Sequence, residues 1–177
     1  MTLEPAPANH GIKFKRVDLG EDAVIDALVD YVTTTARGTT LEKGDVKIST
    51  LEHLMATFSG LGIDNALVNI DAQEVPILDG SAKPYIDAMW ADGFEQQDAP
   101  RSFIELKDVV EMRNDETGSV VRIEPADEFS YDITVDFNSR VLGVQHATWD
   151  PSVVYAEEVG VCRTFVFFHE IEFLFKN

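Results

Sequence analysis

STLEHLMATFSGLGIDNALVNIDAQEVPILDGS, residues 49–81, is the stretch of this sequence that decides its fold. Its first half predicts an amphipathic helix, because apolar residues recur at helical spacing: Leu51, Leu54, Met55, Phe58 and Leu61. Ser49 is a favourable N-cap, and Glu52, three residues later, would complete a capping box. Gly60 and Gly62 supply a stop at the other end of this helix.

The second half of the stretch predicts strands and the start of another helix. Ala66, Val68 and Ile70 occupy alternate positions, which is typical of a half-buried strand, and residues 75–78 are interpreted as another strand. Asp79-Gly80 predicts a turn. Ser81 is then expected to cap a helix that Gly93 ends and that carries Tyr85, Ile86, Met89 and Trp90.

Glu52 and His53 stand side by side in the first turn of the predicted helix. A carboxylate beside an imidazole is a candidate metal site with its own general base. The same residues also have a local interpretation, because a capping box favours Glu at this position and a single His on a helix is more often a surface residue. The sequence has no HExxH motif, and the inverted HxxEH pattern fails because Ser49 stands where its first His should be.

The remaining residues predict two blocks of strands with a few helices, which is an α+β fold. A polar stretch with Pro100, residues 91–102, is interpreted as the boundary between the blocks. In the first block we expect a strand at 12–17 and a hairpin at 39–48, while 21–36 has a helical period. In the second block we expect strands at 103–112, 120–123 and 129–137, followed by a loop that contains His146. A helix is expected from Asp150-Pro151 to about Glu158. A strand or turn at 162–165 and a helix at 167–177 are expected to follow it.

Composition and charge exclude several classes of partner. The chain of 177 residues is 45% hydrophobic, which suits one domain or two small ones. Its formal net charge of -18 repels nucleic acid and anionic lipid, so we expect neither as a partner. We expect no stable membrane insertion, because no apolar run is long enough to span a bilayer. The single Cys162 and the lack of a signal-peptide pattern favour the cytoplasm.

Several motifs, in the same order, resemble those of the UDP-3-O-acyl-N-acetylglucosamine deacetylases, zinc amidohydrolases that commit sugar nucleotides to lipid A synthesis. The matching segments are EPAPANHGIKFKRVDL (4–19), RGTT (37–40), ISTLEHLMATFSGLGIDN (48–65), EVPILDGSAKPY (74–85), VDFN (135–138) and CRTFVF (162–167). The resemblance implies two related small domains, each a sheet with a helix pair, with the helices packed between the sheets. We therefore expect a first domain at 1–97 that lacks its first strand and an incomplete second domain at 98–177, and a strand rather than a helix at 30–35.

The resemblance also implies roles for particular residues. His53 corresponds to a zinc ligand of the family, and Glu52 to its general base. Thr164 corresponds to a hydroxyl that stabilises the tetrahedral oxyanion, and Phe165 to a position along the route of the acyl chain of the substrate. From the sequence alone, a Thr beside an Arg in a strand is structural far more often than catalytic, and the position of Phe165 fits a core aromatic residue at least as well.

The remaining zinc ligands of the family are absent from this sequence. The family takes a second His and an Asp from a later His-Lys-x-x-x-Asp stretch, which does not occur here. We therefore expect a complete parent that is a zinc-dependent N-deacetylase of acylated UDP-sugars, and a 177-residue chain that is inactive alone. One alternative is a non-catalytic shortened relative that acts as a binding module. Another is that the parent is a fusion of the deacetylase with an acyl-carrier-protein dehydratase.

Overall fold

The computed structural model describes residues 1–168 and residue 171, and it confirms the predicted α+β class. Within the described residues, contacts divide the chain into two compact units. Unit 1 consists of residues 1–99 together with the described residues from 155 onward, and unit 2 is Pro100–Val154. The two domains expected at 1–97 and 98–177 stay a prediction, because compact units follow contacts and not internal repeats. None of the described helices is long and apolar enough to cross a membrane.

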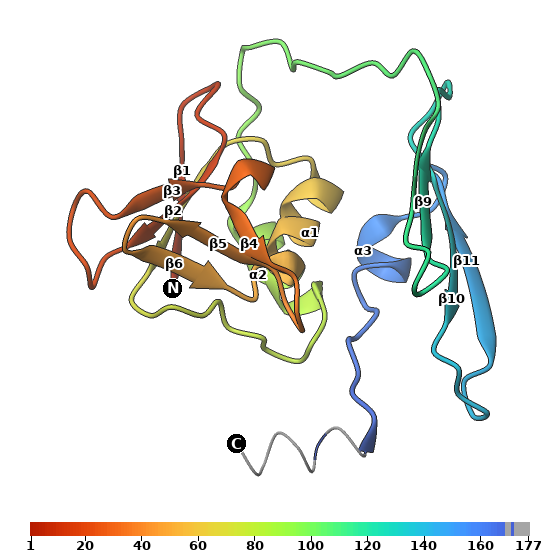
Figure 1. The fold of residues 1–177 in the computed structure, drawn as a ribbon. Helices are drawn as coiled ribbons and strands as arrows, with labels where there is room; N and C mark the ends of the chain where they lie inside the picture. Colours follow the sequence, from red (N-terminus) through yellow and green to blue (C-terminus); the bar gives the residue numbers. More distant parts are fainter. Residues whose placement is uncertain (169–170, 172–177) are drawn as a thin grey trace. The chain divides into compact units, whose positions relative to one another are not determined.

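Unit 1 contains two sheets, and Figure 1 labels their strands except β7. The larger sheet has the strand order β1-β7-β2-β3, in which β2 and β7 run parallel and the other neighbours run antiparallel. The smaller sheet has the order β4-β5-β6 and is antiparallel. The strands are β1 (Thr2–Pro5), β2 (Ile12–Arg16), β3 (Val24–Asp26), β4 (Val32–Thr34), β5 (Thr40–Lys43), β6 (Val46–Ser49) and β7 (Ala66–Ile70).

The predicted strands of the first block are largely confirmed. The strand expected at 12–17 is β2, and β5 with β6 forms the hairpin expected at 39–48. Ala66, Val68 and Ile70 all point into the core from β7, as their alternation predicts. The helical period at 21–36 is misleading, because this segment forms β3, a single 3-10 turn (Val29–Tyr31) and β4.

Helix α1 (Glu52–Leu61) forms where the apolar spacing predicts it, but the capping box is wrong. The N-cap is Leu51, and no side chain caps the helix. Ser49 is still part of β6, where its N–H donates to the carbonyl of Gln73 at 2.9 Å. Because Thr50 then turns with a left-handed φ of 59°, Ser49 lies too early to cap the helix. Gly62 ends α1 at a φ of 70°, whereas Gly60 lies within the helix.

Helix α2 (Lys83–Asp92) begins after Ser81 and ends at Gly93, as predicted. Its N-cap is Ala82, although the Ser81 hydroxyl oxygen accepts the Lys83 N–H at 3.2 Å. Tyr85, Ile86 and Met89 are buried, but Trp90 is 61% exposed. The strand predicted at 75–78 is wrong, because only an isolated bridge joins Ser49 to Glu74 and Pro76 has no N–H to continue a ladder.

One hydrophobic core joins the sheets and the helices of unit 1. Residues from β2, β3, β5, β6, α1, β7 and α2 meet in this core, so both helices are held against the sheets by burial of apolar surface. Its most deeply buried members are Phe14, Ile25, Leu41, Ile48, Leu54, Val68, Ile70 and Val75.

The segment that follows residue 154 returns to unit 1. Helix α3 (Tyr155–Glu158) packs against α1, where the Tyr155 ring lies so close to Gly60 that a Cβ atom at Gly60 would overlap it. A Cβ atom at Gly160 would likewise overlap Cδ1 of Ile86 in α2. The helix predicted from Asp150 is wrong before Tyr155, because Asp150 accepts the N–H of Ser152 at 2.8 Å and closes a turn.

The helix predicted at 167–177 falls mostly outside the described residues. Phe168 and Ile171 have helical backbone, and the other positions from 169 onward are not described.

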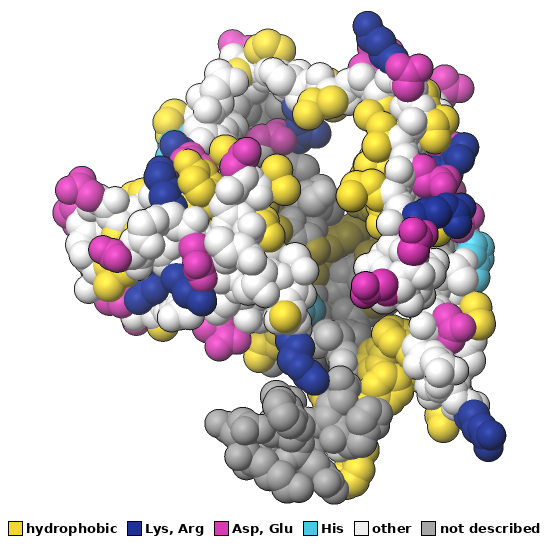
Figure 2. All heavy atoms as spheres, viewed as in Figure 1, with side chains coloured by type: hydrophobic (Ala, Val, Ile, Leu, Met, Phe, Trp, Pro, Cys, Tyr) yellow, Lys and Arg dark blue, Asp and Glu magenta, His cyan; other side chains and the backbone are white. Residues whose placement is uncertain are grey.

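Unit 2 consists of two antiparallel hairpins. β8 (Val110–Arg113) pairs with β9 (Val120–Ile123), and β10 (Tyr131–Asp136) pairs with β11 (Val144–Trp149). The strand expected at 103–112 is thus much shorter. His146 lies in β11 and not in a loop, and its Nε2 is 2.8 Å from Oδ1 of Asp132 on the neighbouring strand β10. No residue of unit 2 is buried, and hydrophobic side chains are visible along its strands in Figure 2.

We expect Gly60→Ala to destabilise unit 1 by about 1–3 kcal/mol, because the new methyl group would overlap Tyr155 in a close-packed contact. In a Tyr155→Ala background the same substitution is expected to stabilise α1 by about 0.5–1 kcal/mol, since alanine is the better helix former. Denaturant unfolding of the four variants measures both values. Destabilisation of equal size in both backgrounds would contradict this packing.

Candidate active site

The backbone that leads into α1 presents Glu52 and His53 at the first turn of the helix. Leu51 is 4% exposed and anchors the turn in the core, whereas the next two side chains are half-buried. The Thr50 hydroxyl donates to Oε1 of Glu74 at 2.8 Å, which fixes the left-handed residue between β6 and the helix. Neither Glu52 nor His53 is enclosed in the apolar interior, so both can meet a ligand.

The Glu52 carboxylate is oriented by the loop before β5. The N–H of Thr39 donates to Oε2 of Glu52 at 2.9 Å. Oε1 of Glu52 lies 3.4 Å from the position that a Cβ atom would take at Gly38. Glycine and a backbone N–H in the RGTT segment therefore let the carboxylate sit close against the loop.

His53 has a fixed backbone and an uncommitted ring. Its carbonyl accepts the hydroxyl of the fully buried Thr57 at 2.9 Å, one turn later in α1. Within the part of the chain that the structure describes, no hydrogen bond to the imidazole is found. The ring nitrogens thus remain available as ligands.

These residues do not make a complete zinc site. Among the described residues there is no group of three or more His, Cys, Asp or Glu side chains that could hold a metal ion. A catalytic zinc site normally takes three protein ligands and keeps one open position. The described residues offer one nitrogen ligand, His53, and one adjacent carboxylate, which agrees with the incomplete ligand set expected from the sequence.

Several hydrogen bonds fix the conformation of the loop between β7 and α2. The Tyr85 hydroxyl donates to the carbonyl of Pro76, and burial raises the pKa of Tyr85 to about 12, so this hydroxyl remains a donor at neutral pH. The Gly80 N–H donates to the Ile77 carbonyl at 3.0 Å. The N–H and hydroxyl of Ser81 both donate to Oδ1 of Asp79, at 3.1 and 2.7 Å.

Arg163 and Thr164 bind this loop from a position far along the chain. The N–H of Thr164 donates to the Gly80 carbonyl at 2.8 Å. The Arg163 guanidinium contacts Oδ2 of Asp79 through Nη2 at 2.8 Å and through Nε at 3.2 Å. The hydrogen bond from Ser81, together with that from Arg163, lowers the pKa of Asp79 to about 2.

The same loop also reaches α1. The Thr57 hydroxyl, which binds the His53 carbonyl, lies 3.5 Å from the carbonyl of Ala82. The helix that carries His53 and the segment that carries Thr164 therefore both contact residues 80–82. Phe165 follows with a 53% exposed side chain that stacks edge-to-face on Phe167 at 5.5 Å, so it is not a core aromatic residue.

Backbone strain is concentrated around these residues. Arg37, Thr50 and Leu78 have positive φ values of 59°, 59° and 52°, which L side chains rarely adopt. Arg37 precedes the loop that binds Glu52, Thr50 precedes α1, and Leu78 precedes Asp79. Such conformations cost on the order of 1–3 kcal/mol each and cluster at functional sites.

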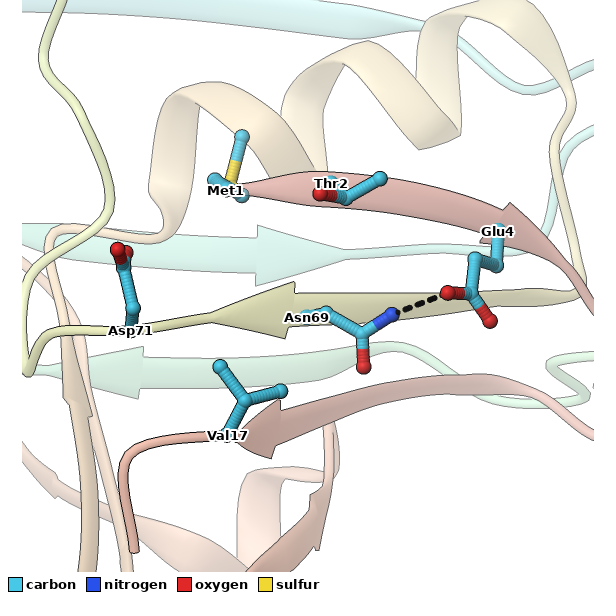
Figure 3. A pocket seen from close by; sticks show the side chains of 6 residues that line it. All are labelled: Met1, Thr2, Glu4, Val17, Asn69 and Asp71. Atoms are coloured by element: carbon cyan, nitrogen blue, oxygen red, sulfur yellow. Dashed lines mark hydrogen bonds between the residues drawn. The ribbon is translucent and has the colours of Figure 1, made fainter.

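A hollow lies elsewhere on unit 1 and shares no residue with this site. It has a volume of about 370 Å³ and lies at the β1-β7 edge, where Asn69 donates to Glu4 at 2.8 Å (Figure 3). None of the predicted site residues lines it. Its carboxylates, Glu4 and Asp71, would repel an anionic ligand.

Sequence reasoning missed Asp79 and Arg163 as a pair. Asp79 reads as a turn residue and Arg163 as a strand neighbour of Thr164, and 84 positions separate them. The sequence carries no signal for this pair, because the Asp-Gly-Ser triplet indicates only a turn and does not point to a partner 84 positions away.

Comparisons with known proteins agree over the whole chain. A family model described as UDP-3-O-acyl N-acetylglycosamine deacetylase matches residues 1–177. A UDP-3-O-acyl-N-acetylglucosamine deacetylase from Methylococcus capsulatus is 45% identical over 180 residues, which cover 100% of this chain and 59% of that protein. A protein of the same name from Coxiella burnetii is 40% identical, again over 100% of this chain and 59% of its own length.

A protein named bifunctional enzyme LpxC/FabZ, from Porphyromonas gingivalis, is 43% identical over 99% of this chain and 38% of its own length. This chain therefore spans 59% or less of the length of these relatives.

The lowered pKa of Asp79 can be tested by substitution. We expect the pKa to rise from about 2 toward its ordinary value of 3.8 in Ser81→Ala, and by less in Arg163→Met, because the Ser81 hydrogen bond is the larger cause. Since the pKa is lower in the folded chain, ionised Asp79 stabilises the fold above about pH 4, and this contribution is lost as the pH falls through about 2. Carboxyl carbon shifts followed by NMR against pH measure the midpoint, and Lys83→Met should leave it unchanged.

Proposed function

This chain belongs to the UDP-3-O-acyl N-acetylglycosamine deacetylase family, and we propose that the complete protein carrying it is a zinc-dependent hydrolase of lipid A biosynthesis. Its reaction is removal of the N-acetyl group from UDP-3-O-acyl-N-acetylglucosamine. The observation that carries this proposal is the pairing of Glu52 and His53 on the first turn of a rigid helix, with the Glu52 carboxylate held by the Thr39 N–H.

Glu52 is the proposed general base. One carboxylate oxygen is fixed at 2.9 Å from the Thr39 N–H, so the carboxylate has a defined direction before substrate binds. A positioned carboxylate can take a proton from the attacking water and return it to the leaving amine. Thr39 thus acts as the support of the base without contacting the substrate.

Thr164 and Phe165 have proposed roles on the substrate side. The Thr164 hydroxyl is a donor for the oxygen that becomes negatively charged during attack on the amide, and a fixed donor of this kind lowers the barrier. Phe165 presents a half-exposed ring to the acyl chain of the substrate. Burial of such a chain against an aromatic ring is favoured by the hydrophobic effect.

Zinc is the proposed cofactor, with His53 as one ligand. When bound, zinc would supply a Lewis acid that polarises the amide carbonyl. The His-Lys-x-x-x-Asp stretch that supplies the other ligands in the family does not occur in this sequence, so we propose that these ligands lie elsewhere in the complete protein and that residues 1–177 alone do not deacetylate the substrate. With one free thiol, Cys162, and no disulfide among the described residues, we propose action in the cytoplasm.

A second candidate is a protein with an additional enzymatic domain. Two similar relatives are named bifunctional enzyme LpxC/FabZ, at 43% and 44% identity to this chain. Reading the coding sequence on both sides of these 177 residues decides between a single enzyme and a fusion with an acyl-carrier-protein dehydratase. A non-catalytic binding module remains the alternative that the activity measurements below would reveal.

Glu52→Gln in the complete protein is expected to lower kcat by about 10²–10⁴-fold, the usual contribution of a general base. Zinc content should be unchanged, because Glu52 is not the proposed ligand. Acetate release from the acylated UDP-sugar and metal analysis give the two measurements. Glu42→Gln, in the β5-β6 hairpin that precedes α1, is the matched control and should retain full activity, because Glu42 pairs with Lys47 and has no proposed role. A fully active Glu52→Gln variant would rule out the proposed base.

His53→Gln is expected to lower the zinc affinity of the complete protein and to abolish its activity, because one of the ligands is lost. His146→Gln, in the exposed hairpin of unit 2, is the matched control and should keep zinc at the same stoichiometry. Equilibrium dialysis with zinc measures both. If the 177-residue chain alone bound stoichiometric, chelator-sensitive zinc and released acetate, the proposal that the other zinc ligands lie outside this chain would be wrong.

A further inference from the structure

The segment that carries Thr164 is fastened to unit 1 at several points. At its start, the Tyr155 ring lies against Gly60 of α1, and Gly160 lies against Ile86 of α2. At its end, the Thr164 N–H donates to the Gly80 carbonyl at 2.8 Å, and Arg163 binds Asp79. These contacts hold the segment at both of its ends, and the last of them is made by Thr164, the residue whose hydroxyl is proposed to act.

The contact between Thr164 and Gly80 restricts the direction of the hydroxyl. Cγ2 of Thr164 lies 3.3 Å from the position of a Cβ atom at Gly80, and Gly80 has a φ of +80°. Because threonine is branched at Cβ, packing its methyl group against Gly80 points the hydroxyl away from Gly80. Any rotation of the backbone at Thr164 would therefore redirect the donor.

Arg163 is the neighbour that can prevent this rotation. Two of its guanidinium nitrogens contact the same oxygen, Oδ2 of Asp79. The other oxygen of Asp79 accepts both hydrogen bonds from Ser81. The carboxylate thus has one oxygen committed to its own loop and one committed to the segment of Thr164, so it transmits the rigidity of the loop to that segment.

We propose that Asp79 is a positioning residue for the proposed deacetylation: by holding Arg163, its carboxylate fixes the backbone of Thr164 and aims the Thr164 hydroxyl. This inference rests on the proposed function and on the role of Thr164 in it. Asp79 itself need not contact the substrate. The Asp79 and Arg163 side chains are 37% and 65% exposed, and exposed ion pairs contribute little to folding stability, so the variants are expected to fold.

The test uses the complete protein with Asp79→Asn, Thr164→Val and both together. Asn keeps an acceptor for Ser81 but removes the charge, and Val keeps the methyl contact at Gly80 but removes the hydroxyl. We expect Asp79→Asn to lower kcat about tenfold with KM within twofold, because a misdirected group loses rate rather than binding. Thr164→Val should lower kcat about 10²-fold, the typical loss of an oxyanion donor.

The decisive measurement is the double variant. If Asp79 acts through the Thr164 hydroxyl, adding Asp79→Asn to Thr164→Val should leave kcat at the Thr164→Val value. Amide hydrogen exchange provides a readout besides activity: Asp79→Asn should speed exchange at the Thr164 N–H about tenfold. Asp87→Asn, which removes the similar ion pair with Lys83 on α2, is the matched control and should change neither quantity.

Multiplicative losses in the double variant, or unchanged exchange at Thr164 in Asp79→Asn, would overturn the inference. So would full activity of Thr164→Val, while a loss in Glu52→Gln would then leave the proposed function intact. If the unsubstituted protein releases no acetate, the proposed function itself fails, and faster exchange in Asp79→Asn would then show only that Asp79 fixes the backbone of Thr164.

Discussion

The left-handed backbone at Thr50 is the constraint on which the candidate site depends. Ser49 is bound in the sheet and to Gln73, while Leu51 is already in the core, so the whole change of direction falls on one β-branched residue with a φ of 59°. This conformation is unfavourable by about 1–3 kcal/mol. It is offset by burial of the apolar face of α1 and by the hydrogen bond to Glu74. The result is that the helix starts at Glu52, which faces the N–H of Thr39, and His53 follows beside it.

Much of unit 1 was predictable because its signals are local. The spacing of Leu54 and Phe58, the alternation in β7 and the stop at Gly62 each describe the residues that form the element. The predictions that failed depended on distant partners. Ser49 did not cap α1 because Gln73, 24 residues later, holds it in the sheet, and β11 had no signal as clear as that of its partner β10. In the site, the adjacency of Glu52 and His53 is visible in the sequence, and the resemblance supplied their roles together with Thr164 and Phe165, all of which stay predictions. The pairing of Asp79 with Arg163 has no local signal at all.

The candidate site combines a rigid element with strained loops. α1 supplies Glu52 and His53 from a helix fixed in the core, whereas Thr39, Gly80 and Thr164 contribute backbone groups from segments without regular structure. Those segments hold their shape because each is tied by hydrogen bonds, such as that of Tyr85 to Pro76. A site assembled in this way can tolerate changes in the loops less well than its surface position suggests, since each backbone group has one fixed partner.

The sequence order of unit 1 has a consequence for how the chain folds. Unit 1 is built from residues that precede and residues that follow 100–154, and the ion pair between Asp79 and Arg163 joins positions 84 apart. During synthesis the sheets and the first two helices can therefore form early, but the segment at Thr164 can join them only after all of unit 2 has left the ribosome. Closing so long a loop is slow relative to forming local contacts. The rigid helix of the site thus matures first, and the segment of Thr164 is the last part of the site to assemble.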